Sequence, residues 1–137
     1  HQHGPQLYTG GYGLGFLIDN SQIAAWLEGT PWSYSEDSLQ TLARYALQGV
    51  RPLVRGPWLD WGARGREFTR LQRESRPAVL RPAIERLAAL VPAQQRELAE
   101  FAAYLGRADD AAPAAPVVEN RHFWRSDFMV HQRPAVY

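Results

Sequence analysis

Residues 81–105 read RPAIERLAALVPAQQRELAEFAAYL, and this stretch decides the fold class. Pro82 and Pro92 each suit the first turn of a helix, because that position needs no backbone N–H donor. Apolar residues recur at helical spacing after each proline: Ile84, Leu87, Ala88 and Val91 after the first, and Leu98, Phe101, Ala102 and Leu105 after the second. The spacing predicts two helices packed as a hairpin.

The amino-terminal part predicts a glycine-rich loop followed by a helix. Residues 1–15 contain too many glycines for a regular element, so we expect an ordered loop that leads into the helix. Residues 14–27 are apolar at most positions, which indicates a helix buried on most of its sides, and Gly29 ends it.

A second helix is expected after Ser33, where apolar residues again recur with helical period from Leu39 to Val50. Ser33 and Glu36 have the separation of a capping box, which favours a helix start there. Gly49 and Pro52 are expected to end the helix.

Residues 107–116 (RADDAAPAAP) show no apolar periodicity and contain two prolines, so we interpret them as a linker. Residues 117–137 are β-branched and aromatic with rough alternation, which is typical of strands. The chain is therefore expected to be mainly helical, with strands at its carboxyl end.

Composition limits the function classes. The 137 residues are 45% hydrophobic, which is enough for one domain with a real core, and no apolar run approaches the ~20 residues of a membrane-spanning helix. The absence of cysteine excludes a disulfide scaffold, thiolate zinc sites and a cysteine nucleophile. Residues 51–86 hold nine arginines against four acidic residues, and guanidinium groups bind carboxylates and sulfates bidentately. These features favour an anionic partner.

Three motifs carry the candidate functional residues. The first is HQHGPQLYTGGYG at residues 1–13, which places His3 nine residues before Tyr12. The second is ARGREFTR at residues 63–70, and the third is ENRHFWRSDFMVHQRP at residues 119–134. Each motif alone is explained without function, as a terminal histidine, packing tyrosines or a solvated row of arginines.

No metal site is expected. His122 and His131 are nine residues apart on predicted strands, which is not the spacing of zinc ligands. A free amino terminus at His1 could bind copper, as in oxidative polysaccharide enzymes, but those are β-sandwiches and this chain is mostly helical. Residues 51–70 combine prolines, glycines and arginines with Trp58 and Trp61, which indicates a functional loop whose indoles could pack in the core or stack on sugar rings.

Together the three motifs resemble those of polysaccharide lyase family 8, which contains the chondroitin AC, hyaluronate and xanthan lyases, and the HGPQLY stretch is most similar to the chondroitin AC branch. The resemblance covers nearly the whole chain. It implies the last helical hairpins of an incomplete (α/α) toroid, followed by the first strands of an antiparallel β-sandwich domain. Residues 1–106 would be the carboxyl-terminal part of the toroid catalytic domain, 107–116 the linker and 117–137 the start of the β-sandwich. The amino-terminal toroid and the later β-domains would be missing.

The resemblance also implies roles for individual residues. His3 and Tyr12 match the catalytic His and Tyr of the family, and Arg66 and Arg70 match its active-site arginines. Glu119 would match an acidic residue that supports those arginines. The carboxylate-neutralising Asn of the family lies upstream of His3. The residues expected to contact substrate are Arg64, Trp58 and Trp61.

The implied reaction is β-elimination, which removes the C5 proton of a uronic acid and expels the C4 oxygen. Tyr12 would act as base or as acid, with His3 as its partner, and the motif does not show which of the two residues is the base and which is the acid. A guanidinium about 4 Å from a phenol stabilises the phenolate enough to prepare it, so Arg66 or Arg70 beside Tyr12 would suffice. The mechanism requires no cofactor.

We therefore expect a lyase fragment that acts on chondroitin or hyaluronan and is inactive alone, from a secreted or periplasmic protein. The expected partner is an acidic polysaccharide. No nucleic-acid or membrane partner is expected. One alternative is a xanthan lyase. Another is a non-catalytic helical module that binds acidic polysaccharides, and a third is a structural segment without activity.

Overall fold

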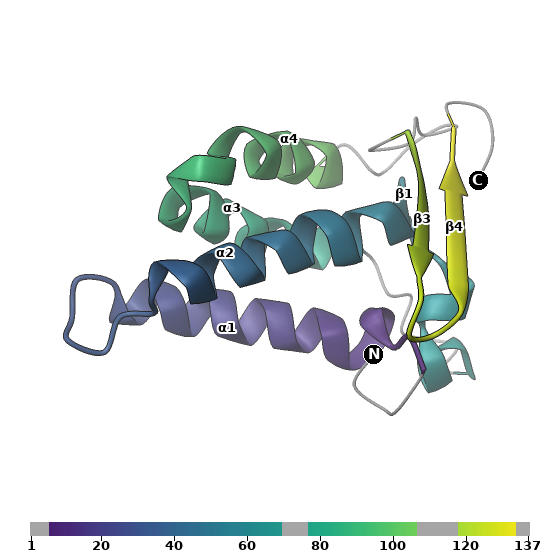
Figure 1. Cartoon of the computed structure of the whole chain (residues 1–137), viewed down its shortest axis with the longest axis horizontal. Helices are drawn as coiled ribbons and strands as arrows, with labels where there is room; N and C mark the ends of the chain where they lie inside the picture. Colours follow the sequence, from purple (N-terminus) through teal and green to yellow (C-terminus); the bar gives the residue numbers. More distant parts are fainter. Residues whose placement is uncertain (1–5, 70–76, 107–117, 134–137) are drawn as a thin grey trace.

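The computed structural model describes residues 6–69, 77–106 and 118–133. Within these ranges the chain forms four α-helices, several short 3-10 and π-helical segments, and two small antiparallel sheets. Figure 1 shows α1 and α2 lying side by side, with α3 and α4 stacked beyond them and the β3–β4 hairpin standing across one end. The fold is mainly helical, as predicted.

Helix α1 spans Leu14–Leu27, the predicted range, and Gly29 follows it with a φ of 73° that favours glycine. The expectation that α1 is buried on most sides is wrong for the described residues. The buried positions form one stripe at helical spacing: Leu14, Leu17, Ser21 and Ala24. The indole of Trp26 is 72% exposed, because α1 contacts α2 and α3 on one face only.

Helix α2 spans Glu36–Arg44, and its cap differs from the predicted one. Ser35 is the N-cap, and its side chain accepts a hydrogen bond from the Ser38 amide at 3.3 Å. The Ser33 side chain is instead directed to the preceding turn, where its hydroxyl donates to the carbonyls of Leu27 and Thr30. Two serines compete at this start, and the nearer one forms the cap.

The second helix changes its hydrogen-bonding pattern before the expected end at Gly49 and Pro52. After α2 the chain continues as a π-helical segment, Tyr45–Val50, and a 3-10 turn, Arg51–Leu53. Gly49 lies inside the π-helical segment, where an added Cβ would come within 2.9 Å of the Tyr45 ring. The glycine therefore makes room for a side chain instead of ending the helix.

The carboxyl-terminal helical hairpin matches the prediction. A 3-10 turn, Pro77–Leu80, leads into α3 (Arg81–Leu90), and a second, Pro92–Gln94, leads into α4 (Gln95–Gly106). Helix α3 packs along α4 and also contacts α1. Ala88 is only partly buried, and the other predicted inward residues are buried: Ile84, Leu87, Val91, Leu98, Phe101, Ala102 and Leu105.

The arginine-rich segment after α2 is more ordered than a loop. Strands β1 (Val54–Arg55) and β2 (Trp58–Leu59) form a short antiparallel pair, and 3-10 turns follow at Trp61–Ala63 and Gly65–Thr69. The aliphatic residues Val54, Leu59 and Ala63 of the segment belong to the core. The amide of Gly56 donates to the Tyr104 hydroxyl of α4 at 2.6 Å, which ties the β1–β2 turn to the hairpin.

Strands β3 (Glu119–Phe123) and β4 (Phe128–Gln132) form the predicted antiparallel pair, with Glu119 opposite Gln132 and Phe123 opposite Phe128. This hairpin docks on the helical part. Val130 is in the core, and the fully buried Gln132 donates its amide to the carbonyls of Pro52 and Val54. The predicted linker at 107–116 lies outside the described residues.

Replacing Gln132 by Leu is expected to lower the free energy of unfolding by roughly 1–3 kcal/mol, because two buried carbonyls lose their donor. Urea unfolding followed by circular dichroism measures the change. Gln40→Leu is the matched control, since Gln40 makes only an exposed i,i+4 bond to Glu36. Equal unfolding midpoints for the two variants would show that the Gln132 contacts do not stabilise the docked hairpin.

Candidate active site

The two candidate catalytic residues that the structure describes, Tyr12 and Arg66, lie in contact. The Arg66 Nη2 donates to the Tyr12 hydroxyl at 3.2 Å, and the guanidinium carbon lies 6.0 Å from the centre of the phenol ring. The Tyr12 side chain is 44% exposed, so its oxygen is within reach of a bound molecule. The other two candidates, His3 and Arg70, lie outside the described residues.

A π-helical turn at Thr9–Gly13 positions Tyr12, where the sequence predicted an irregular loop. This turn requires glycines, because neighbouring side chains occupy the space that a Cβ atom would need. An added Cβ at Gly11 would collide with the Tyr8 ring, and one at Gly13 would collide with the Tyr45 hydroxyl. The prediction failed because it treated the glycines as chain breakers, whereas they allow close packing here.

Tyr8 joins the turn that carries Tyr12 to the segment that carries Arg66. Its ring is buried and meets the Tyr12 ring edge-on, with centroids 5.0 Å apart. Its hydroxyl donates to Glu67 Oε1 at 3.3 Å. At Gly65 the φ is +54°, and an added Cβ would lie 2.5 Å from the Tyr8 ring. Sequence reasoning treated Tyr8 as a packing residue and did not single out Glu67 next to Arg66.

The residues predicted to contact substrate differ in exposure. Trp58 and Trp61 are 58% and 67% exposed, so both indoles are available for stacking. Arg64 is only 8% exposed, and its guanidinium lies 5.0 Å from the Trp61 ring centre. The burial of Arg64 leaves little of it for a ligand and indicates a role in holding Trp61 by a cation–π contact.

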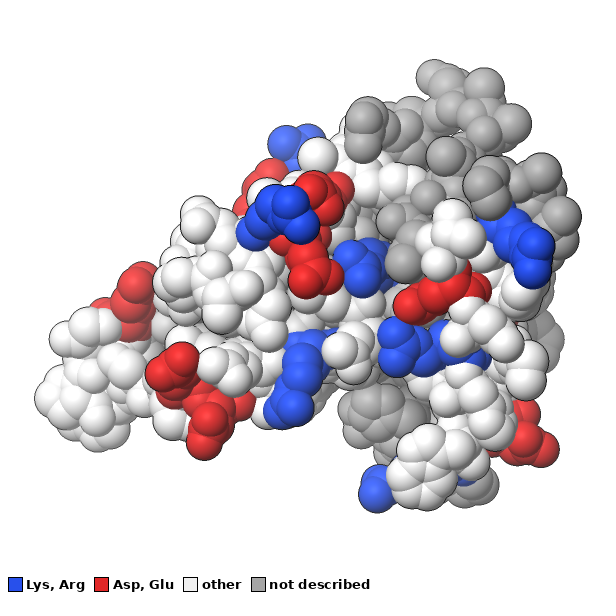
Figure 2. Space-filling model, turned by 45° about the horizontal axis from the view of Figure 1, so that its top comes forward, with Lys and Arg blue, Asp and Glu red and all other residues white. Residues whose placement is uncertain are grey.

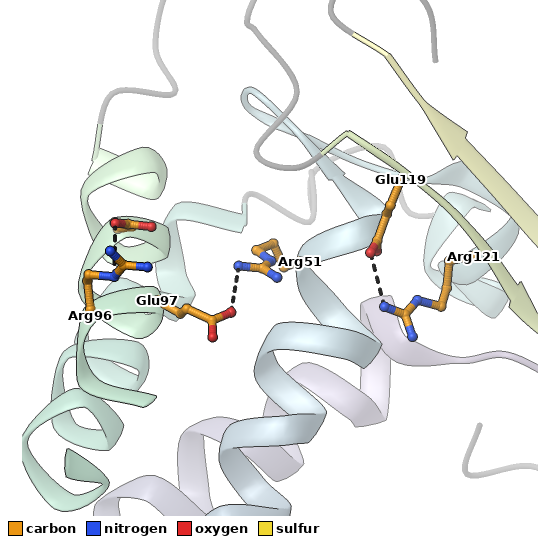
Figure 3. A network of polar contacts seen from close by, with 6 residues as sticks. Arg51, Arg96, Glu97, Glu119 and Arg121 are labelled. Carbon is orange, nitrogen blue, oxygen red and sulfur yellow. Dashed lines mark hydrogen bonds and ion pairs between the residues drawn. The ribbon is translucent and has the colours of Figure 1, made fainter. Parts of the chain in front are cut away.

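Glu119 lies on β3 and forms an ion pair with Arg121 at 3.0 Å. Figure 3 shows this pair and a second one, between Arg51 and Glu97 at 3.7 Å. Among the described residues, the carboxylate linked to Tyr12 is that of Glu67: it accepts the hydrogen bond of the Tyr8 hydroxyl, and the Tyr8 ring contacts the Tyr12 ring. A supporting role of Glu119 toward the active-site arginines remains a prediction.

A cavity of about 390 Å³ lies between the helical part and the turn of the β3–β4 hairpin. Its walls include Thr9 and Tyr45 on one side and Trp124 and Arg125 on the other. Burial raises the pKa of Tyr45 to about 12, and the contact with Thr9 acts in the opposite direction. The Tyr45 hydroxyl therefore stays protonated at neutral pH. Sequence reasoning missed this cavity, although Trp124 and Arg125 stand in the third motif.

The surface charge is divided along the molecule. In Figure 2 arginines and acidic residues lie together over the middle of the face shown, whereas the tip of the α1–α2 connection carries only acidic residues among its charged ones. Along the sequence, residues 51–86 hold nine arginines against four acidic residues, and residues 1–50 hold one arginine against four. The Tyr12–Arg66 pair belongs to the arginine-rich part of the chain, which favours an anionic ligand.

The described ranges contain neither a metal-ligand cluster nor a membrane-spanning helix. No cluster of three or more His, Asp or Glu side chains there could hold a metal ion. None of the helices in those ranges combines the length and the apolar character needed to cross a membrane.

Comparisons with known proteins identify relatives of this chain. Residues 1–104 match the model of the polysaccharide lyase family 8 N-terminal α-helical domain. Chondroitinase-AC of Pedobacter heparinus is 30% identical over 138 residues, which cover 98% of this chain and 19% of that protein. A solved structure of chondroitinase AC lyase, from a study of its active site and oligosaccharide complexes, matches with a TM-score of 0.81 and 26% identity. That match covers 98% of this chain and 20% of the other, so the chain spans about a fifth of its relatives' length.

Proposed function

This chain belongs to polysaccharide lyase family 8, and we propose that it supplies part of the active site of a longer lyase that cleaves a uronic-acid polysaccharide by β-elimination. The observation that carries the proposal is the Tyr12–Arg66 pair, because it holds the phenol oxygen of a half-exposed tyrosine against a guanidinium. The relationship to chondroitinase AC supports the reaction class.

In the proposed reaction Tyr12 transfers the proton. The Arg66 N–H that points at the phenol oxygen stabilises the phenolate. The phenolate takes the C5 proton of the uronic acid, and the electron pair of the C5–H bond moves onto the neighbouring carboxylate. That electron pair then forms the C4–C5 double bond as the C4–O bond breaks. The leaving oxygen takes a proton, which the Tyr12 hydroxyl can return. Tyr12 would thus serve first as base and then as acid.

Other groups complete the proposed site. His3 and Arg70 are assigned as partners of Tyr12, and an Asn from a segment upstream of this chain would stabilise the substrate carboxylate. Trp58 and Trp61 would stack on sugar rings, since both indoles are exposed. The chain alone is therefore expected to have little activity.

We propose that residues 1–106 form the end of a helical toroid and that residues 117–137 begin a β-sandwich domain, with 107–116 between them. The match of residues 1–104 to a helical-domain model supports this division, as does the change from helices to strands. The longer protein would be secreted or periplasmic, since polymers of this kind are extracellular.

Chondroitin or hyaluronan is the proposed substrate, and the relationship to chondroitinase AC favours them over xanthan. A non-catalytic module that binds acidic polysaccharides is the second candidate. The exposed indoles of Trp58 and Trp61 beside an arginine-rich segment suit such a module equally well.

The test compares this chain with an extended protein, defined as this chain together with the residues encoded on either side of it. Each is mixed with chondroitin, hyaluronan or xanthan, and the ultraviolet absorbance of the unsaturated uronic acid is followed. We expect product from the extended protein, and little or none from the chain alone. An extended protein that is folded and binds these polymers without forming product would refute the lyase proposal and favour the binding module.

A further inference from the structure

We propose that the turn of the β3–β4 hairpin, with the cavity behind it, is a second carbohydrate-binding site that takes an acidic sugar unit of the polysaccharide chain. The inference deepens the proposed function and rests on it for the nature of the ligand. The residues that define this site, here called the turn site, are Tyr45, Gln48, Arg121, Trp124 and Arg125.

The turn site has the size and the walls of a ligand pocket. Its volume of about 390 Å³ falls within the range of about 300–1,000 Å³ that small-molecule sites occupy. One wall comes from the segment after α2, and the opposite wall comes from the hairpin turn, which lies more than 70 residues away along the chain. Two parts of the fold therefore meet around one concavity.

Trp124 and Arg125 supply the recognition chemistry. The Trp124 indole is 72% exposed, so it contributes little to the core, and the Arg125 guanidinium lies 5.0 Å from its ring centre. An exposed aromatic face next to a guanidinium can stack on a sugar ring while the cation binds a carboxylate or sulfate. Gln48 adds a neutral hydrogen-bonding group for sugar hydroxyls, and Tyr45 contributes its ring to the wall, because its hydroxyl is buried beside Gly13.

The same indole–guanidinium pairing occurs at Trp61 and Arg64, also with 5.0 Å between the guanidinium and the ring centre. Phe128 connects the two pairs. Its ring packs against Gly62, the residue after Trp61, so closely that an added Cβ there would collide with it. On the other side, Phe128 lies opposite Phe123, the residue before Trp124, at the hairpin turn. The Arg64 guanidinium is buried, so this second pair offers a ligand its exposed Trp61 indole. The exposed indoles of Trp61 and Trp124 on neighbouring segments suit a ligand with repeating sugar units.

Local contacts hold the hairpin turn in one shape. The Ser126 amide donates to the Phe123 carbonyl at 3.0 Å, and His122 contacts Asp127 at 3.1 Å. Arg121 is held by Glu119 at 3.0 Å. A binding surface that is already ordered loses less conformational entropy when it binds.

The turn site and the proposed catalytic residue Tyr12 share one short segment of the chain. Thr9 lines the cavity and begins the π-helical turn that carries Tyr12 three residues later. A polysaccharide bound at Tyr12 could therefore extend to the turn site. Short oligosaccharides would fill only the catalytic end.

The experiment uses Trp124→Ala and Arg125→Gln in the extended protein, with Trp32→Ala as the matched control. Trp32 is 74% exposed but lies in the α1–α2 connection, away from both sites. Binding of hyaluronan and chondroitin oligosaccharides is measured by calorimetry in a Tyr12→Phe background, so that turnover does not interfere. Thermal unfolding verifies that the variants are folded.

We expect about tenfold weaker binding of long oligosaccharides for each turn-site variant, as for the loss of one charge-assisted or stacking contact. Short oligosaccharides and the Trp32→Ala control should bind as the parent does. With Tyr12 restored, KM should rise more than kcat falls. Binding of long oligosaccharides that is equal in Trp124→Ala and Trp32→Ala would overturn the proposal. Because binding is read without turnover, a failure of the lyase proposal would appear separately, as the absence of product from every variant.

Discussion

Replacing Tyr12 by Phe in the extended protein is expected to lower kcat by roughly 10²–10⁴-fold, the usual contribution of a positioned acid–base group. The substitution removes the oxygen that receives the Arg66 hydrogen bond and leaves the ring that packs against Tyr8. The fold and the affinity for polysaccharide should therefore change little. Product absorbance measures kcat, and calorimetry measures binding.

Tyr34→Phe is the matched control for Tyr12→Phe. The Tyr34 hydroxyl also makes one side-chain hydrogen bond, to Asn20 at 3.0 Å, but on the α1–α2 pair. This variant should keep its turnover. If Tyr12→Phe and Tyr34→Phe turned over substrate at the same rate, Tyr12 would not be the proton-transfer residue.

Replacing Arg66 by Gln is expected to lower kcat by about 10²–10³-fold, as for the loss of one preorganised donor at a developing negative charge. Gln keeps a hydrogen-bonding end and loses the positive charge, so the Tyr12 phenolate would lose its nearest electrostatic stabilisation among the described contacts. Arg66→Lys should recover part of the rate, since the charge returns without the guanidinium fork. The same absorbance assay gives these rates.

Arg96→Gln controls for the loss of one positive charge elsewhere. Arg96 lies on α4, its side chain is 88% exposed, and it pairs with Glu100 at 3.9 Å. The control should keep its turnover, because surface pairs of this kind contribute little. An Arg66→Gln enzyme as fast as Arg96→Gln would rule out electrostatic preparation of Tyr12 by Arg66.

Helix positions were predictable where one local signal dominated. Continuous apolar residues between glycines predicted α1, and prolines followed by apolar spacing predicted the turns that open α3 and α4. The predictions failed where local signals competed. Ser35 caps α2 because Ser33 is engaged in the preceding turn, and Gly49 lies within a helix because its missing side chain accommodates Tyr45.

The candidate site, too, was predictable in part: its residue types could be predicted, and their contacts could not. The residue types could be read from the sequence, namely a tyrosine in a glycine-rich segment and arginines in a basic centre, and with them the chemistry that these side chains can perform. The three-dimensional packing was needed to show that Arg66 donates to Tyr12, that Tyr8 lies between their segments and that Arg64 is buried. Tyr12 and Arg66 are 54 residues apart, and helical or strand periodicity relates only residues a few positions apart. Their contact depends on the packing of the π-helical turn against the Gly65–Thr69 segment, and that packing follows from the core as a whole.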